Sequence, residues 1–214
     1  MQTAYSEWTY KGSDALALAA TKLFAARPHP SRLSPLILMA DPARIADVLS
    51  AAQALLEGAT LIYRHFGKEG RAAEAKALRH ITFERRQQFL IGNDPDLAIE
   101  VGADGVHFRR DAAVRDPALW RTRCPDWLIT MAGIKAGDYR GGLDVLDGLF
   151  VSPVFDSQSP SAGDPIGLKR FSNSVKTLKA PVFALGGITA ANAHELAGSG
   201  AAGLAGISGF APRT

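Results

Sequence analysis

Short apolar runs without polar alternation recur along this 214-residue chain, and segments with helical spacing separate them. A continuous apolar run is typical of a parallel strand, because both of its faces are buried. The runs predict eight strands, at residues 36–40, 60–63, 89–92, 105–108, 127–130, 149–151, 182–185 and 201–207. Eight strands that alternate with helices favour an α/β fold, and a closed TIM (β/α)8 barrel is its natural form.

Helical spacing is expected at residues 14–26, 43–56, 71–79, 96–101, 112–122 and 142–146, and again after the loop 153–166 and from Thr189 onward. The first helix, opened by Ser13, precedes the first strand. We therefore divide the chain into an N-terminal extension with one helix, residues 1–35, and a single barrel domain, residues 36–214.

Six residues, Gly209 to Thr214, follow the eighth strand, so the barrel is expected to lack the helix after that strand. A bare apolar flank would promote association. Either the N-terminal helix or a partner subunit is therefore expected to cover it, and a homodimer is one possible assembly.

The net charge of +3 and the 21% content of charged residues are ordinary for a globular protein. The basic pairs Arg79-His80, Arg85-Arg86 and Arg109-Arg110 have no interleaved aromatic residues, so nucleic acid is not expected as a partner. They are either solvated helix ends and loops or a basic rim that attracts a phosphorylated substrate. Cys124 is the only cysteine, which excludes an intrachain disulfide and fits a reducing cytoplasm. No apolar run approaches the roughly 18 residues of a membrane span.

Two glycine-containing turns, at the ends of the seventh and eighth strands, predict a phosphate site. Gly186 and Gly187 end the seventh apolar run, and Ser208 and Gly209 end the eighth. Glycine leaves main-chain N–H groups accessible to an oxyanion, and the loops after strands 7 and 8 of a TIM barrel often bind phosphate. Phosphorylated small molecules are therefore the expected ligands.

Polar residues also stand at the carboxyl ends of other predicted strands, where side chains of a TIM barrel project into the active-site mouth. They are Asp41, Arg64, Asn93, Asp94, His107, Thr130 and Ser152. The Asp94 carboxylate could hold Mg2+, which takes one or two protein carboxylates besides water and phosphate oxygens. Asp111, in the loop after the fourth strand, is the candidate second carboxylate. Alternatively, Asp94 caps the helix that begins at Pro95.

Six blocks of sequence together resemble the superfamily of thiamine phosphate synthases and TenI-like thiazole tautomerases. They are Tyr63-Arg64, Asn93-Asp94 with Asp96-Leu97-Ala98, Val101 to His107, Ser152 to Phe155, Ala184 to Ile188 with Asn192, and Gly200 to Ser208. The resemblance implies an enzyme that joins hydroxymethylpyrimidine diphosphate to a thiazole phosphate, releases pyrophosphate and uses Mg2+. In this reading Arg64 binds the diphosphate, Asn93 the substrate and Asp94 the metal. Gly186, Gly187, Ile207 and Ser208 hold the thiazole phosphate.

The chain departs from the family pattern at the diphosphate and metal positions. Phe66 replaces a lysine two residues after Arg64, and Lys68 is the nearest substitute. Ala112 aligns with the family's second metal-binding aspartate, which leaves Asp111 one residue out of place.

Two later loops depart as well. After the fifth strand, Met131 and Gly133 replace the family's serine and histidine, and Thr130 stands in for the serine hydroxyl. The loop after the sixth strand keeps hydroxyl groups at Ser157 and Ser159 but lacks the family's lysine.

Two other functions therefore stay open beside the transferase. A thiazole isomerase would need an acid–base group, but His107 belongs to a motif that both branches share, which favours a structural bond to a neighbouring loop. A non-catalytic protein would keep the phosphate site and lack the chemistry.

Overall fold

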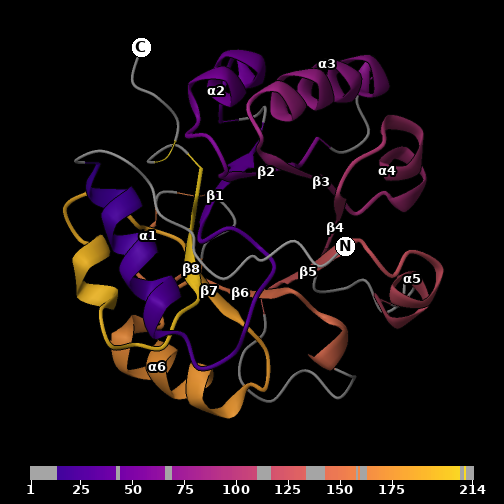
Figure 1. The fold of residues 1–214 in the computed structure, drawn as a ribbon. Helices are drawn as coiled ribbons and strands as arrows, with labels where there is room; N and C mark the ends of the chain where they lie inside the picture. Colours follow the sequence, from indigo (N-terminus) through magenta and orange to yellow (C-terminus); the bar gives the residue numbers. More distant parts are fainter. Residues whose placement is uncertain are drawn as a thin grey trace.

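A computed structural model describes residues 14–41, 44–65, 69–109, 117–133, 143–157, 159, 163–207 and 210 of the chain. Within these residues, parallel strands form one closed barrel (Figure 1). The strands are β1 (Leu36–Ala40), β2 (Thr60–Tyr63), β3 (Gln88–Gly92), β4 (Gly105–Phe108), β5 (Leu128–Ala132), β6 (Gly148–Val151), β7 (Val182–Leu185) and β8 (Gly203–Gly206). Each strand pairs with the next in sequence, and β8 returns to pair with β1. The predicted α/β TIM barrel is confirmed.

Helices and 3-10 turns lie on the outside of the barrel (Figure 1). They are α1 (Ala15–Ala26), α2 (Val48–Ala54), α3 (Arg71–Glu84), α4 (Pro95–Val101), α5 (Pro117–Arg123), η2 (Leu143–Val145), α6 (Gly167–Thr177) and η3 (Ala193–Leu196). In the described part of the chain, none of these helices has the length and hydropathy that crossing a membrane requires.

Several predicted helix boundaries are wrong. The helix expected from residue 43 begins only at Val48, because the backbone N–H groups of Arg44 and Ile45 donate to the Asp41 carbonyl in a turn. Asp47 then caps α2 through the backbone N–H of Ser50.

Other helices differ in length from the prediction. α3 continues to Glu84, five residues beyond the expected end at Arg79. The helices expected at residues 142–146 and after Thr189 are single 3-10 turns, η2 and η3. α5 begins at Pro117, and residues 110–116 before it lie outside the described part.

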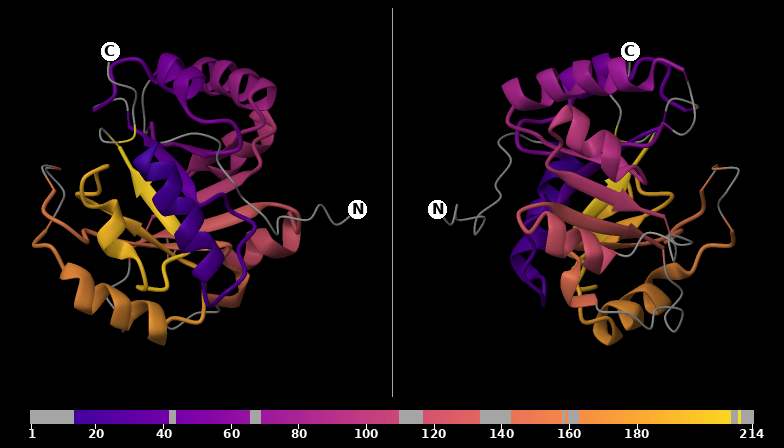
Figure 2. Two further views of the ribbon diagram at one scale, coloured as in Figure 1. Left: turned by 60° about the vertical axis from the view of Figure 1, so that its left-hand side comes forward. Right: turned by 90° about the vertical axis from the view of Figure 1, so that its right-hand side faces the viewer.

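The flank beside β8 is covered by α1, which packs against β1, β8 and η3 (Figure 2). Asp14 rather than Ser13 caps this helix, through the backbone N–H groups of Leu16 and Ala17. The buried face of α1 belongs to the same apolar cluster as the outer faces of the strands. The sequence offered two possible covers for this flank, the N-terminal helix and a partner subunit, and the structure shows the helix in this position. No described residue after β8 is helical.

A second apolar cluster fills the inside of the barrel. Its fully buried members include Ile37, Ile62, Leu90 and Phe150, together with Leu33 from the segment before β1. Leu33 thus joins the inner core although it precedes the first strand. The cluster closes the barrel interior, so the space for a ligand lies at the carboxyl ends of the strands.

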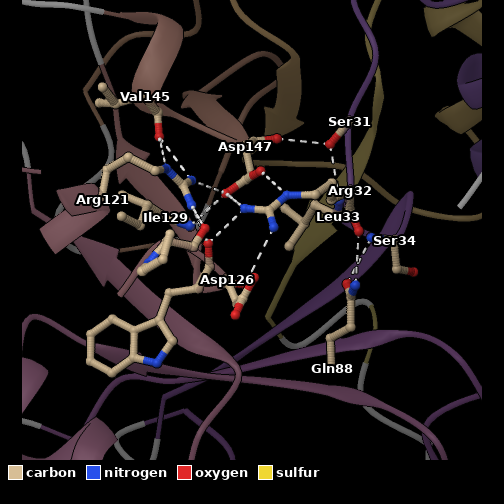
Figure 3. A network of polar contacts seen from close by, with 12 residues as sticks. Ser31, Arg32, Leu33, Ser34, Gln88, Arg121, Asp126, Ile129, Val145 and Asp147 are labelled. Atoms are coloured by element: carbon tan, nitrogen blue, oxygen red, sulfur yellow. Dashed lines mark hydrogen bonds and ion pairs between the residues drawn. The ribbon is translucent and has the colours of Figure 1, made fainter. Parts of the chain in front are cut away.

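A network of charged groups lies at the amino end of the barrel (Figure 3). Its centre is the buried Asp147, immediately before β6, whose carboxylate contacts Arg32 at 2.7 Å and Arg121 at 2.6 Å. The same carboxylate accepts the Ile129 backbone N–H at 2.8 Å, and the Asp147 carbonyl accepts the Ser31 hydroxyl at 2.7 Å. These contacts tie the segment before β1 to β5 and β6.

Candidate functional site

The barrel register places three of the predicted residues, Arg64, His107 and Thr130, close together at the carboxyl ends of neighbouring strands. Gly92, His107 and Thr130 are paired neighbours on β3, β4 and β5. Tyr63 pairs with Ile91, so Arg64, the next residue, lies beside Gly92. Gly92 has no side chain, so no β3 side chain separates Arg64 from His107 at this level.

His107 is 3% exposed. Its Nδ1 lies 2.9 Å from Oγ1 of the fully buried Thr130, and its ring packs edge-on against Phe150 at a centroid distance of 5.1 Å. Burial, with a smaller contribution from the Arg64 charge, lowers the pKa of His107 to about 3. His107 is therefore neutral at physiological pH, and its partner is strand β5 rather than the neighbouring loop expected from the sequence.

This low pKa makes the stability of the protein depend on pH. An unfolded histidine has a pKa near 6.5, so below that pH the unfolded chain takes up a proton that the folded chain does not. Stability is therefore complete above about pH 6.5 and falls by about 1.4 kcal/mol per pH unit as the pH approaches 3.

From pH 7 to pH 5, we expect the wild type to lose about 2 kcal/mol more free energy of unfolding than the variant His107→Asn. Urea denaturation of both proteins at the two pH values measures this difference. Equal losses would contradict the assignment.

Arg64 belongs to a group of charges around the mouth. Burial lowers the pKa of Arg64, the Asp41 carboxylate raises it, and the positive charges of Arg109 and Arg44 lower it further. These residues follow β1, β2 and β4, whose carboxyl ends meet at the same edge. From the sequence, Arg109 was expected only as part of a basic pair, and Arg44 was not predicted as a site residue.

The other basic pairs have partners away from the mouth. Arg79 contacts the Asp104 carboxylate at 3.0 Å, Arg85 donates to the Leu55 carbonyl at 3.0 Å, and Arg86 contacts Glu57 at 3.3 Å. Of these described basic residues, only Arg109 immediately follows a strand, where a basic rim around the mouth would lie. Arg79, Arg85 and Arg86 lie on a helix or at its end, as the other interpretation expects.

Asp94 caps α4, as the alternative interpretation predicted. Its Oδ1 accepts the Leu97 backbone N–H at 3.0 Å, and its Oδ2 contacts Arg71 Nη1 at 2.8 Å. The backbone of the preceding Asn93 has a left-handed conformation, with φ of 53°, and its N–H donates to the His107 carbonyl at 2.8 Å. The β3 end is therefore tied to both α3 and β4. Asp94 also lines a surface groove with Arg71 and Glu100.

The first turn of α3 holds the end of β2 as well. Glu74 accepts a hydrogen bond from the Tyr63 hydroxyl, and its Oε2 lies 2.9 Å from His65 Nδ1. Burial and Glu74 together raise the pKa of Tyr63, which keeps this hydroxyl protonated. Glu74 thus ties α3 to the end of β2, and Arg71 ties α3 to Asp94 after β3. The sequence did not indicate these contacts.

The Gly186-Gly187 turn is shaped by packing against the loop after β6. Both glycines are left-handed, with φ of 93° and 69°. A Cβ on Gly187 would lie 2.3 Å from the Asp156 carbonyl oxygen, and one on Gly186 would lie 2.7 Å from Pro153. The Gly187 carbonyl accepts the Asn192 side-chain amide at 2.9 Å. Glycine is therefore required here by the fold itself, besides the anion role that the sequence suggested.

The remaining predicted residues are placed as follows. Ser157 and Ser159 are partly exposed, and the Ser159 N–H donates to the Ser157 hydroxyl at 3.3 Å. Ile207 is partly exposed at the end of β8. Lys68, Asp111 and Ser208 lie outside the described residues. Within the described ranges, no three acidic, histidine or cysteine side chains gather in a way that could hold a metal ion.

Fold and mouth together define a single parallel (β/α)8 barrel whose active-site end carries several arginines and a glycine turn. The model of the thiamine monophosphate synthase family matches residues 36–210. The chain belongs to the thiamine monophosphate synthase family.

Individual relatives agree with this assignment. A thiamine-phosphate synthase of Methanoculleus marisnigri is 32% identical over 166 residues, which cover 76% of this chain and 73% of that protein. A thiamine-phosphate synthase of Streptococcus agalactiae is 32% identical over 145 residues, 66% of this chain. The chain spans 64% of the length of the Streptococcus protein and 63% of a relative from Geobacter sulfurreducens. The structure of a thiamine phosphate pyrophosphorylase from Pyrococcus furiosus superposes with a TM-score of 0.64 at 27% identity, covering 81% of this chain and 85% of that one.

Proposed function

We propose that the protein is a thiamine phosphate synthase, a transferase of thiamine biosynthesis. The observation that supports this most strongly is the position of Arg64, half-buried in the barrel mouth beside His107 and two further arginines, in a chain of this family. A concentration of positive charge at the carboxyl ends of barrel strands suits a substrate whose leaving group is a diphosphate.

In the proposed reaction, the bond between the pyrimidine methylene carbon and the diphosphate oxygen breaks, and the electron pair leaves with pyrophosphate. The thiazole nitrogen then donates its lone pair to the cationic carbon, which gives thiamine phosphate. Arg64 neutralises the charge that develops on the leaving group, and Asn93 orients the pyrimidine. Little covalent chemistry is asked of the protein, so holding the two substrates in line supplies much of the acceleration.

The thiazole phosphate is proposed to bind at the opposite side of the mouth. Its binding residues there are Gly186, Gly187, Ile207 and Ser208, with hydroxyl groups from Ser157 and Ser159. Thr130 is fully buried, so we propose that it contributes to substrate binding indirectly, by holding the His107 ring in place through their hydrogen bond. Lys68 is a further candidate for the diphosphate.

Mg2+ is the proposed cofactor, with Asp94 as one ligand and Asp111 as the candidate second. The donor chemistry fits in part, since Mg2+ uses one or two carboxylates and takes its other ligands from water and phosphate. Both Asp94 oxygens already accept one contact each, from Leu97 N–H and from Arg71, so a metal would share this carboxylate. When bound, the ion would neutralise part of the diphosphate charge.

The variant Asp94→Asn tests the metal assignment. Asparagine also caps helices well, so α4 should persist, but the loss of the carboxylate should raise the Mg2+ concentration needed for half-maximal activity about tenfold. Product formation is measured against Mg2+ concentration, with the exposed Asp96→Asn as control in the same helix turn. An unchanged Mg2+ dependence of Asp94→Asn would remove this residue from the metal site.

The transferase itself is tested by incubating purified protein with hydroxymethylpyrimidine diphosphate, thiazole phosphate and Mg2+. Thiamine phosphate is the expected product. Its absence beside an active control enzyme would overturn the proposal. Conversion of the thiazole phosphate alone, without Mg2+, would instead identify an isomerase, for which the neutral, buried His107 is an unsuitable base. A rise in melting temperature with thiazole phosphate, but none with the diphosphate and Mg2+, would identify a binding protein.

The expected setting of the protein follows the same proposal. We propose that it acts on phosphorylated small molecules in the cytoplasm, with neither nucleic acid nor membrane as a partner. A homodimer also stays a proposal, although α1 already covers the flank for which a partner subunit was considered. Leu18 on α1 is 44% exposed and lies on a helix that a second copy could contact. Sedimentation of the purified protein measures this directly.

A further inference from the structure

The two sequence neighbours of Arg64 contact one carboxylate on α3. The Tyr63 hydroxyl donates to Oε2 of Glu74, and Nδ1 of His65 lies 2.9 Å from the same oxygen and 2.7 Å from the Tyr63 hydroxyl. Tyr63 is fully buried, and His65 is 9% exposed. Three polar groups thus meet at one point, and two of them come from the residues on either side of Arg64.

The protons of this cluster follow from the donors present. Tyr63 has one hydroxyl proton, which it donates to Glu74, and burial together with Glu74 raises the pKa of Tyr63. The contacts of His65 Nδ1 with two acceptor oxygens then require a hydrogen on Nδ1. Tyr63 and His65 are therefore both donors to Glu74.

Arg64 points away from this cluster, into the barrel. Ile62 belongs to the inner apolar cluster and Tyr63 to the outer one. Side chains two residues apart on a strand share a face. Arg64 therefore continues the inner face of Ile62. His65 continues the outer face of Tyr63, where both side chains contact Glu74.

The backbone of Arg64 is also fixed from a third direction. Its N–H donates to the Ala40 carbonyl of β1 at 2.9 Å. Rotation of the chain at Arg64 would break this hydrogen bond or separate Tyr63 or His65 from Glu74. An arginine side chain has several rotatable bonds, so a fixed backbone is a condition for placing its guanidinium group accurately.

Glu74 also has an ordinary role as an acidic residue in the first turn of α3, where a negative charge stabilises a helix. That role requires no contact with β2. Arg71, three residues earlier on the same helix, contacts Asp94 after β3 at 2.8 Å. The first turn of α3 therefore contacts the ends of two adjacent strands, which carry the residues proposed for the diphosphate and for the metal.

We infer that Glu74 is a positioning residue for Arg64, and that it acts by accepting hydrogen bonds from Tyr63 and His65. The inference rests on the transferase function proposed above and adds to it a residue on the outer side of the barrel. Arg64 is proposed to bind the diphosphate of the pyrimidine substrate. Loss of Glu74 should therefore impair the use of that substrate and leave the binding of thiazole phosphate unchanged.

Steady-state kinetics of Glu74→Ala, alone and combined with Arg64→Gln, test the role in the reaction. In Glu74→Ala the Tyr63 hydroxyl can still donate to His65, so the barrel should fold. We expect a loss of about tenfold in kcat/KM for the pyrimidine substrate and an unchanged KM for thiazole phosphate. When Arg64 is already glutamine, the further loss should be small, because the effect acts through Arg64.

Two other variants complete the kinetic series. Glu74→Gln keeps an acceptor oxygen at the same reach and should recover most of the loss. Glu84→Ala is the matched control, because Glu84 lies at the other end of α3 and its side chain is 63% exposed. This control should have wild-type kinetics.

Hydrogen exchange of the Arg64 backbone N–H, followed by NMR, tests the positioning without any substrate. The hydrogen bond from this N–H to Ala40 should open more often without Glu74, so we expect exchange about tenfold faster in Glu74→Ala than in the wild type. The Val154 N–H, which donates to the Leu185 carbonyl at 3.0 Å after β6, is the internal reference and should exchange at the wild-type rate.

The inference is wrong if the Arg64 N–H of Glu74→Ala exchanges at the wild-type rate, or if this variant keeps wild-type kinetics. It is also wrong if the kinetic loss adds in full to that of Arg64→Gln, or if Glu74→Gln loses as much as Glu74→Ala, which would assign the effect to the charge. Melting temperatures identify an unfolded Glu74→Ala, and Tyr63→Phe, which keeps the buried ring and lacks the hydroxyl, then takes its place. If the wild type forms no thiamine phosphate, the transferase is wrong, and the exchange rates still decide whether Glu74 holds Arg64.

Discussion

The variant Arg64→Gln is expected to lose about 100-fold to 1,000-fold in kcat/KM for the condensation of the two phosphorylated substrates. Arg64 is half-buried, its backbone is held by the Ala40 carbonyl, and no β3 side chain stands between it and His107. A charge in such a partly dehydrated position stabilises a leaving group far better than a solvated one. Steady-state rates at saturating Mg2+, with each substrate varied in turn, measure the loss.

The pattern of the loss separates a direct role from a structural one. If Arg64 binds the diphosphate, the KM for the pyrimidine substrate should rise while the KM for thiazole phosphate stays near the wild-type value. Arg64→Lys should recover part of the rate, because it retains the charge but not the bidentate geometry. Equal losses toward both substrates, together with a lower melting temperature, would assign Arg64 to the scaffold instead.

The variant Asp147→Ala is expected to destabilise the fold by about 3 kcal/mol, at the low end for breaking a buried ion pair. The substitution leaves the Ile129 N–H without its acceptor and removes the shared partner of Arg32 and Arg121 (Figure 3). The side chains of Arg32 and Arg121 are 38% and 23% exposed, so water restores part of the lost interaction. Urea denaturation measures the change, and thermal melting should shift down by about 6–12 °C.

Asp126→Ala is the matched control for Asp147. Asp126 lies in the same region and is exposed, and its contact with Arg32 runs through the backbone carbonyl, which alanine keeps. The control should therefore melt close to the wild type. A similar loss in both variants would show that the region as a whole, rather than the Asp147 carboxylate, sets the stability. Because the network lies opposite the mouth, the activity of folded Asp147→Ala should be close to normal.

The strand pattern of the fold could be predicted from the sequence because every strand is buried on both faces. β1, β2, β4 and β7 agree residue for residue with the apolar runs that predicted them. The helices were predicted less well, since their ends depend on local hydrogen bonds. The turn at Asp41 and the single-turn η3 are examples in which apolar spacing suggested more helix than the backbone forms.

The site was only partly predictable. Arg64, His107 and Thr130 follow from their places at strand ends, and the register brings them together. Arg44 lies four residues past the end of β1, in a turn whose geometry the sequence did not indicate. The Arg71–Asp94 contact joins two residues that are 23 positions apart in the sequence, and no local pattern encodes it. Likewise, pairs of adjacent basic residues look alike in the sequence whether they lie at the mouth, as Arg109 does, or on a helix, as Arg79 does.

The position of α1 has a consequence for how the chain reaches its native state during synthesis. Among the described elements, this helix leaves the ribosome before the barrel strands, yet two of its contacts, β8 and η3, are the last of these elements to be made. Until β8 emerges, the apolar face of α1 lacks these partners and β1 lacks one of its two neighbours. Contacts of such long sequence separation form late and slowly. Nascent chains that stop short of β8 should therefore depend on chaperones and be sensitive to proteases, and protection should appear in one step when the final strand is complete.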